Sequence, residues 1–233
     1  MAKKDVIIAL DFKDRQETMN FINKFNRDLF VKVGMELFYK EGTDIIKALQ
    51  EKGHKIFLDL KLHDIPTTVY KAMKNIAKLE VSMVNVHALG GEEMMTQAIY
   101  GLNEGSNKKR PLCIAVTILT SLKQDIVNNE LLINGKVDDI IKQYAYSTKK
   151  AGLDGVVCSP LEANIIHQSN GNDFLTVTPG IRLENDFCHD QKRIATPIIA
   201  KELGANYIVV GRSITQSIDP QNTYQTIKKQ FME

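Results

Sequence analysis

Short runs of apolar and β-branched residues, bounded by turn-forming residues, recur along the whole chain. Such runs are typical of strands in a parallel sheet, where both faces are covered. Between them, apolar residues recur three or four positions apart, as at Val69, Met73 and Ile76, which is the spacing of an amphipathic helix. Eight segments contain runs of the strand type: 5–12, 29–35, 55–62, 83–88, 112–119, 154–159, 174–181 and 207–214.

This alternation predicts an α/β protein, because each connection between parallel strands must bury its apolar face against the sheet. Eight such units within 233 residues, without a Gly/Ser-rich linker, favour a closed (β/α)8 TIM barrel made of one domain spanning residues 1–233. Where the first run ends, the sequence reads ALDFKDRQE and contains no GxGxxG turn, which disfavours an open dinucleotide-binding sheet. The last helix is expected to begin at Asp219-Pro220, a cap residue followed by a proline.

Composition and charge narrow the class of protein. The chain is 43% hydrophobic and 25% charged, which is ordinary for a folded globular protein. Its formal net charge is only +2, and the lysines are spread out, so neither nucleic acid nor a membrane surface is expected as a partner. The first apolar segment is too short for a signal peptide or a membrane span, so we expect a cytoplasmic protein.

The cysteines and histidines do not predict a disulfide framework or a metal site. Cys113, Cys158 and Cys188 are odd in number and contain no CxxC pair. The first two lie in apolar runs and are expected to pack as small hydrophobic residues. The sequence gives Cys188 no role. The histidines lack the spacing to carboxylates that specifies zinc, so no metal ion is expected.

Charged residues gather at the carboxyl end of the third predicted strand, the end of a barrel where chemistry is expected. Asp59 and Lys61 are two positions apart and so project to the same face, while Asp64 falls at the turn into the next helix. Lys32, on the preceding strand, adds a second ammonium next to Asp59. The four residues form a Lys-Asp-Lys-Asp chain that neutralises its own charge and is a candidate for catalysis.

Structural explanations of the same residues stay open. Asp59 and Lys61 would also serve as an ion pair that closes the barrel. Asp64 would also serve as a helix cap before Pro66, and this role is compatible with chemistry.

The last two predicted strands end in glycine and arginine, a combination suited to phosphate. Glycine lets backbone N–H groups approach an anion, and arginine offers a planar fork of donors. The segment 183–193 is long enough to fold over a ligand, although it could equally be a passive connection. The arginines could likewise be surface residues that follow a turn. The candidate anion-binding residues are Pro179, Gly180, Arg182, Gln191, Gly211 and Arg212.

These residues lie in segments that resemble bacterial orotidine 5′-phosphate decarboxylases over essentially the whole chain. The most specific segment is DLKLHDIPTTV, which contains the DxKxxD pattern of that superfamily. Supporting segments are IIALDF, FVKVGMELF, VNVHALGG, AVTILTS, VTPGIR, DQKR and IVVGRSIT.

The resemblance implies a carboxy-lyase that converts orotidine 5′-phosphate to uridine 5′-phosphate and CO₂, the last step of de novo UMP synthesis, without a cofactor. It implies that Lys61 donates the proton to C6 within a network completed by Lys32, Asp59 and Asp64. It also implies a homodimer in which Asp64 and Thr68 reach the partner's site. The implied nucleotide contacts are Asp11 and Lys32 at the ribose, Ser121 beside Thr120 at the pyrimidine, Gln191 with Arg212 at the phosphate, and further Asp59, Pro179, Arg182 and Gly211.

Three rival functions remain to be distinguished. A 3-keto-L-gulonate 6-phosphate decarboxylase or a hexulose phosphate synthase shares the DxKxxD pattern but uses Mg²⁺, which the ammonium of Lys32 would repel. A Schiff-base aldolase would need Lys61 uncharged, whereas flanking carboxylates favour the charged form. A catalytically silent sensor of phosphate ligands would not need the complete set of lysines and aspartates.

Overall fold

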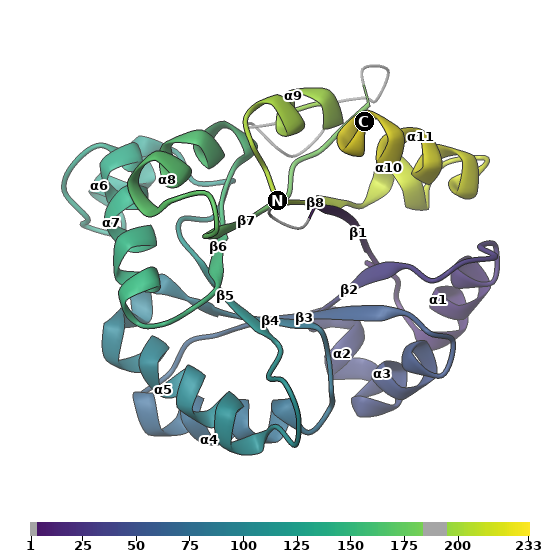
Figure 1. Ribbon diagram of the computed structural model, residues 1–233, viewed down its shortest axis with the longest axis horizontal. Coiled ribbons are helices and arrows are strands. Elements are labelled where there is room, and N and C mark those ends of the chain that lie inside the picture. Colours follow the sequence, from purple (N-terminus) through teal and green to yellow (C-terminus); the bar gives the residue numbers. More distant parts are fainter. Residues whose placement is uncertain (1–3, 184–194) are drawn as a thin grey trace.

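Eight parallel strands form a closed barrel in sequence order (Figure 1). The computed structural model describes residues 4–183 and 195–233. Each strand pairs with the next, and β8 pairs with β1. The predicted (β/α)8 barrel is therefore confirmed, while a single domain over residues 1–233 stays a prediction. The strands are β1 (Asp5–Ala9), β2 (Phe30–Gly34), β3 (Lys55–Leu62), β4 (Met83–His87), β5 (Leu112–Val116), β6 (Gly155–Val157), β7 (Leu175–Thr178) and β8 (Tyr207–Val210).

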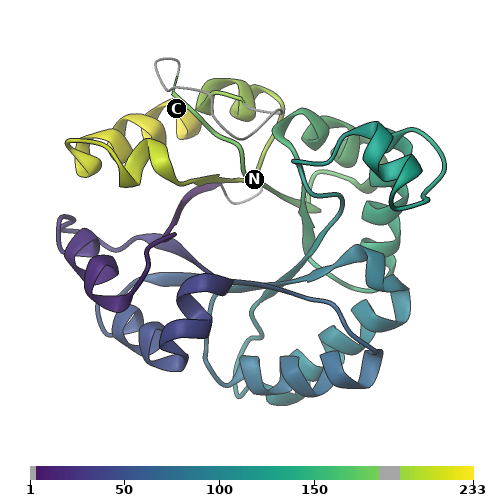
Figure 2. The ribbon, with the colours of Figure 1, turned by 180° about the vertical axis from the view of Figure 1, so that it is seen from behind.

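The helices lie outside the ring of strands, as the views from both ends show (Figures 1 and 2). The last of them begins as predicted, because the side chain of Asp219 accepts a hydrogen bond from the N–H of Asn222 at 3.0 Å. The α-helices of the described residues are α1 (Arg15–Ile22), α2 (Met35–Glu41), α3 (Thr43–Gln50), α4 (Pro66–Ala77), α5 (Gly91–Gly105), α6 (Gln124–Asn129), α7 (Val137–Lys150), α8 (Ala163–Asn170), α9 (Pro197–Glu202), α10 (Arg212–Thr215) and α11 (Pro220–Met232). Two short 3₁₀ helices, η1 (Ala88–Gly90) and η2 (Pro160–Glu162), follow β4 and β6.

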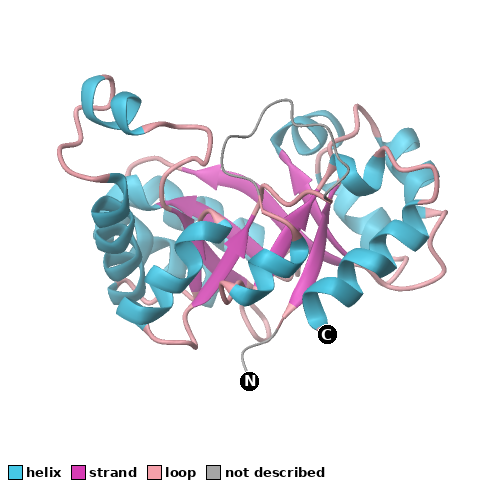
Figure 3. Cartoon of the chain, turned by 90° about the horizontal axis from the view of Figure 1, so that it is seen from above, coloured by secondary structure: helices cyan, strands magenta, loops and turns pink. Residues whose placement is uncertain are grey.

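Two apolar layers hold the barrel together, one inside the ring of strands and one between the strands and the helices. The inner layer includes Phe30, Phe57 and Met83, which lie near the starts of their strands. Successive side chains of a strand alternate between its two faces, so the residue two positions later also points inward. Inward-facing residues nearer the carboxyl ends of β2, β3 and β4 are therefore stacked above this apolar floor. The side view in Figure 3 shows the strands enclosed by helices on either side.

Helices α4 and α5 pack with their backbones in close approach. A side chain at Gly101 would overlap the carbonyl oxygen of Tyr70, and one at Gly105 would overlap that of Lys74. Only glycine allows this separation, because it has no Cβ atom. The close packing fixes the position of α4, which begins directly after the DxKxxD segment.

The two described cysteines behave as predicted. Cys113 and Cys158 are fully buried and unpaired. Burial raises the pKa of the Cys113 thiol to about 12 and raises that of Cys158 as well, so both thiols stay protonated and pack as small apolar groups. Cys188 lies outside the described residues. Within those residues, no helix is long and apolar enough to cross a membrane.

Candidate active site

Three neighbouring strands carry polar side chains on the inner face of the barrel, beyond the apolar floor. Lys32, Asp59 and Asn85 each follow an inward-facing apolar residue by two positions, on β2, β3 and β4. The strand register places Phe57 opposite both Lys32 and Met83, and places Asp59 opposite Gly34. Asp59 and Asn85 therefore lie two residues nearer the carboxyl ends of their strands than Phe57 and its partner Met83, and the long Lys32 side chain reaches Asp59. The period of the strands is thus what brings these groups together.

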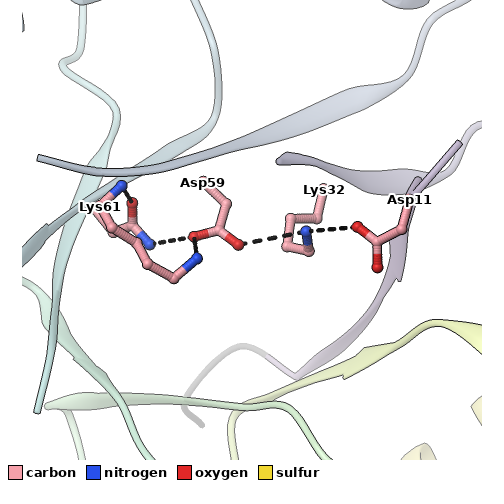
Figure 4. Close-up of polar contacts among 5 residues, drawn as sticks. Asp11, Lys32, Asp59 and Lys61 are labelled. Carbon is pink, nitrogen blue, oxygen red and sulfur yellow. Dashed lines mark hydrogen bonds and ion pairs between the residues drawn. The ribbon is translucent and has the colours of Figure 1, made fainter. Parts of the chain in front are cut away.

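An alternating row of charges joins β1, β2 and β3 (Figure 4). The Nζ atom of Lys32 lies 3.2 Å from Oδ1 of Asp11 and 3.4 Å from Oδ2 of Asp59. The other carboxylate oxygen of Asp59 accepts a hydrogen bond from Nζ of Lys61 at 2.7 Å. Two ammonium and two carboxylate groups therefore balance, which lowers the cost of burying them. The placement of Lys32 next to Asp59 that the sequence predicts is confirmed.

Burial and charge act in opposite directions on the two inner members of the row. The side chains of Lys32 and Asp59 are only 12% and 10% exposed. Burial alone would lower the pKa of Lys32, but the charges of Asp59 and Asp11 outweigh it and raise that pKa. Burial alone would raise the pKa of Asp59, but Lys32, Lys61 and the hydrogen bond from Asn85 outweigh it and lower that pKa. Both groups are therefore charged at neutral pH.

The main chain at Lys61 departs from regular strand geometry. Lys61 has a φ of 51°, a left-handed value that a residue with a side chain rarely adopts. The pairing of β3 with β4 shifts register between Leu58 and Leu62, so β3 carries extra residues there. The bulge re-aims the Lys61 side chain while Nζ still reaches Asp59. The expectation that Asp59 and Lys61 share a face holds, although the strand is irregular between them.

Two residues at the site were not identified from the sequence. Asn85 donates from Nδ2 to Oδ1 of Asp59 at 2.6 Å and accepts the backbone N–H of Lys61 at 2.8 Å. Gly34 leaves room for Lys32, since a Cβ atom at this position would lie 3.1 Å from Nζ. A polar residue within the apolar run of 83–88 is the signal that could have revealed Asn85.

Asp64 does not extend the row of charges within the described chain. Its side chain is exposed, and Oδ1 accepts a hydrogen bond from the N–H of Ile65 at 2.6 Å. Among residues 4–183 and 195–233 it forms no ion pair with Lys61, so the Lys-Asp-Lys-Asp chain ends at its third member. Asp64 is not the helix cap either, because the cap position of α4 falls on Ile65, whose side chain cannot accept a bond. Thr68 is exposed on the first turn of α4.

Several of the predicted nucleotide contacts lie in connections that follow the carboxyl ends of strands. Thr120 is half-buried and Ser121 exposed in the connection after β5. After β7, Pro179 is half-buried, and Nη1 of Arg182 donates to the carbonyl oxygen of Ile181 at 3.0 Å.

The end of β8 lies beside the row of charges. A Cβ atom on Gly211 would lie 3.9 Å from Oδ2 of Asp11, so the two strand ends are adjacent. Gly211 is also the residue before α10, and the exposed Arg212 is the first residue of that helix. The segment that contains Gln191 is outside the described residues.

Two histidines stand beyond Asn85 at the carboxyl ends of β3 and β4. The rings of His63 and His87 have their centres 5.7 Å apart. Burial, together with the nearby His63 and Lys61, lowers the pKa of His87, which favours its neutral form at neutral pH. Within the described chain, no group of three or more His, Cys, Asp or Glu side chains is placed to hold a metal ion.

Comparison with known proteins identifies the family. Residues 4–227 match the model of the orotidine 5′-phosphate decarboxylase / HUMPS family. The chain belongs to this family. Relatives from Bacillus mycoides (strain KBAB4) and Bacillus cereus (strain B4264), both named orotidine 5′-phosphate decarboxylase, are 55% identical to it over 231 residues, or 98% of this chain and 97% of each relative.

Solved structures from the same comparison agree with the fold. The crystal structure of orotidine 5′-phosphate decarboxylase from Lactobacillus acidophilus is 44% identical and matches with a TM-score of 0.90, covering 99% of this chain and 100% of that one. A structure from Geobacillus kaustophilus, described as an uncharacterized conserved protein, is 46% identical with a TM-score of 0.88, covering 97% and 100%. Both matches thus cover nearly the whole of this chain.

Proposed function

We propose that the chain converts orotidine 5′-phosphate to uridine 5′-phosphate and CO₂, with Lys61 as the acid that protonates C6 of the pyrimidine. The activity and its place in pyrimidine biosynthesis rest on the family and on the relatives that are 55% identical over 98% of the chain. The role of Lys61 rests on one observation, the row of alternating charges from Asp11 to Lys61 at the carboxyl end of the barrel.

The reaction needs positive charge at a fixed position. Loss of CO₂ breaks the bond to C6 and leaves its electron pair on that carbon, with no adjacent carbonyl or imine to accept it. Ammonium groups already held in place stabilise this charge better than water, because they need not reorganise as it develops. The Nζ atom of Lys61, anchored 2.7 Å from Asp59, is suited to stabilise the carbanion and then transfer a proton to it.

The remaining members of the row have supporting roles in this proposal. Asp59 holds both lysines, and Lys32 with Asp11 would contact the ribose hydroxyl groups. Gln191, Arg182 and Arg212 would bind the phosphate, with Gly211 and Pro179 beside them. Ser121, beside the nucleotide contact Thr120, would contact the pyrimidine. Binding energy gathered at the phosphate would then help to organise the charged groups around the ring.

Lys32 also argues against the magnesium-dependent members of the superfamily. Its ammonium lies 3.4 Å from Asp59, the carboxylate that a divalent cation would otherwise use. A cation of charge +2 beside this ammonium would be strongly repelled. The proposal therefore includes catalysis without a metal ion or other cofactor.

The role of Lys61 is tested by Lys61→Ala, with Lys150→Ala as a matched control. Lys150 forms an ion pair with Glu92 on the protein surface, at 3.0 Å. Loss of the substrate's ultraviolet absorbance measures decarboxylation, and calorimetric binding of uridine 5′-phosphate measures whether the site is intact. We expect the Lys61 variant to bind the product but to lose activity by several orders of magnitude, while the Lys150 variant behaves as the wild type. An active Lys61 variant would remove this residue from the mechanism, and an inactive wild type would refute the proposed reaction.

A homodimer with Asp64 and Thr68 crossing into the partner's site, and a cytoplasmic location, belong to the same proposal. The exposure of Asp64 and its lack of an ion pair within the described chain are consistent with a partner on the other subunit. Lys61→Ala and Asp64→Asn should each be inactive, and mixing them allows the subunits to exchange. In a mixed dimer one site would combine the intact Lys61 of one subunit with the intact Asp64 of the other, whereas the second site would lack both. Random exchange should restore about a quarter of the wild-type activity. No recovery despite proven exchange would place Asp64 in its own subunit's site, and an active Asp64→Asn variant would place it outside any site.

A further inference from the structure

Asn85 has a buried side chain whose amide nitrogen and amide oxygen both form hydrogen bonds. It is 2% exposed, on the inner face of β4. Its Nδ2 donates to Oδ1 of Asp59 at 2.6 Å, and its Oδ1 accepts the backbone N–H of Lys61 at 2.8 Å. The oxygen of Asp59 that Asn85 binds is the one that holds Nζ of Lys61. One amide thus fixes both the main chain and the charge partner of Lys61.

The main chain at Lys61 requires such a contact. Its φ of 51° lies in the left-handed region, and the register between β3 and β4 is interrupted between Leu58 and Leu62. The N–H of Lys61 therefore has a side-chain acceptor on β4 in place of a regular ladder partner. Unusual backbone conformations persist only where surrounding groups fix them. Asn85 is the group that does so here.

We infer that Asn85 is a positioning residue of the decarboxylase, which holds Lys61 and Asp59 in the arrangement that directs the Lys61 ammonium at the reacting carbon. The inference rests on the proposed role of Lys61. Asparagine is suited to this position because it donates to one group and accepts from the other. Leucine would do neither, and an ionised aspartate would place a second negative charge beside Asp59.

The first experiment compares Asn85→Ala with Asn206→Ala as a matched control. Asn206 is also 2% exposed, and its Oδ1 accepts the N–H of Thr176 at 2.8 Å at the opposite, amino-terminal end of the barrel. Both variants lose a buried amide, so a merely structural role predicts similar effects. We expect Asn85→Ala to lower the single-turnover rate by about 100-fold with KM changed by less than about threefold, because small misplacement of a catalytic group costs this much. Asn206→Ala should keep the wild-type rate.

The second experiment uses Asn85→Asp, which preserves the shape of the side chain. The ionisable groups near position 85 in the described chain include Asp59 and Lys61 on β3, Lys32 beyond Asp59 on β2, and His87 on β4 with His63 beside it, while β5 presents Ile114. Two carboxylates at this distance share a proton, and the protonated aspartate can donate to Asp59 as the amide does. The ratio of variant to wild-type kcat should therefore rise about tenfold or more as pH falls from about 8 to about 5. A carboxylate at position 85 would itself raise the pKa of His87, so the same ratio measured on a His87→Gln background removes the contribution of that titration.

The outcomes separate this inference from the proposed function. If Asn85→Ala folds with a wild-type rate, or if its loss is matched by Asn206→Ala, the inference is wrong even though the wild type remains an active decarboxylase. If Asn85→Ala does not fold, the Asn85→Asp ratio decides, and a ratio independent of pH refutes the inference. Failure of the proposed function would appear instead as an inactive wild type or an active Lys61→Ala.

Discussion

Replacing Lys32 with methionine removes one charge from the centre of the row while preserving most of the side chain's length. The remaining charges, Asp11, Asp59 and Lys61, no longer balance. Asp59, which is 10% exposed, keeps only Lys61 and Asn85 as partners. A buried carboxylate that loses an opposite charge becomes costly, so the substitution should destabilise the fold as well as the site.

The magnitude follows from the geometry. At 3.4 Å and an effective dielectric constant of about 20, the attraction between Lys32 and Asp59 is about 5 kcal/mol. Desolvation of the Lys32 ammonium offsets part of this attraction, and Asp11 adds little because its side chain is 66% exposed. We expect the Lys32→Met variant to lose about 2–4 kcal/mol in the free energy of unfolding at neutral pH.

The pH of the assay follows from the direction of the shifts. The pKa of Lys32 is raised, so its stabilising contribution is fully present below 10.5 and is lost only as pH rises through the folded value. The pKa of Asp59 is lowered, so its contribution is fully present above about 3.8 and is lost as pH falls through the folded value. At neutral pH both contributions are complete, and urea unfolding there measures the full effect.

Lys150→Met is the control for this measurement, since it removes an exposed lysine from a surface ion pair with Glu92. It should change stability little, and the difference between Lys32→Met and wild type should shrink once acid protonates Asp59. A Lys32→Met variant as stable as Lys150→Met at neutral pH would show that the row of charges does not hold the barrel mouth together.

Asp59 and two closely packed glycines, Gly34 and Gly101, are further sites at which the structure can be tested. The pKa of Asp59 is lowered, so acid should reduce activity through protonation of Asp59 only as pH falls below about 3.8. A pH–rate profile measured down to the lowest pH at which the protein stays folded checks this. A loss of activity that is assigned to Asp59 and occurs well above pH 3.8 would contradict it. Gly34→Ala would place Cβ 3.1 Å from Nζ of Lys32 and should lower kcat/KM about tenfold with little change in melting temperature. Unchanged kinetics would show that the Lys32 side chain can shift without affecting catalysis. Gly101→Ala would overlap the carbonyl oxygen of Tyr70 and should cost about 1–3 kcal/mol in urea unfolding, whereas an unchanged midpoint would mean that α4 and α5 separate easily.

The fold could be predicted because parallel strands buried on both faces have a distinctive pattern. Runs such as DVIIA and YIVV contain no polar residue after their first position, and the helices between them show the complementary spacing. The start of α11 was predictable from Asp219 and Pro220, because a cap depends on neighbouring residues alone. Local chemistry and periodicity thus sufficed for the barrel.

The site was only partly predictable, because its irregular parts depend on contacts between strands. The two-residue period placed Asp59 and Lys61 on one face, but nothing in the sequence indicates the left-handed φ of 51° at Lys61. Asn85 was missed for the same reason, since its role depends on the register of β4 against the bulge in β3. The cap assigned to Asp64 was wrong by one residue, because the chain stays extended as far as Ile65. The roles of the nucleotide-binding residues, Gln191 among them, stay predictions.

In the proposed reaction, fixed lysine charges replace a metal ion in the decarboxylation of orotidine 5′-phosphate. The decisive measurement is turnover by protein freed of metal with a chelator, followed as loss of substrate absorbance before and after addition of Mg²⁺. We expect full activity in the chelated protein and no increase on adding the metal. Activity that disappears with chelation and returns with Mg²⁺ would show instead that a metal ion takes part in the reaction.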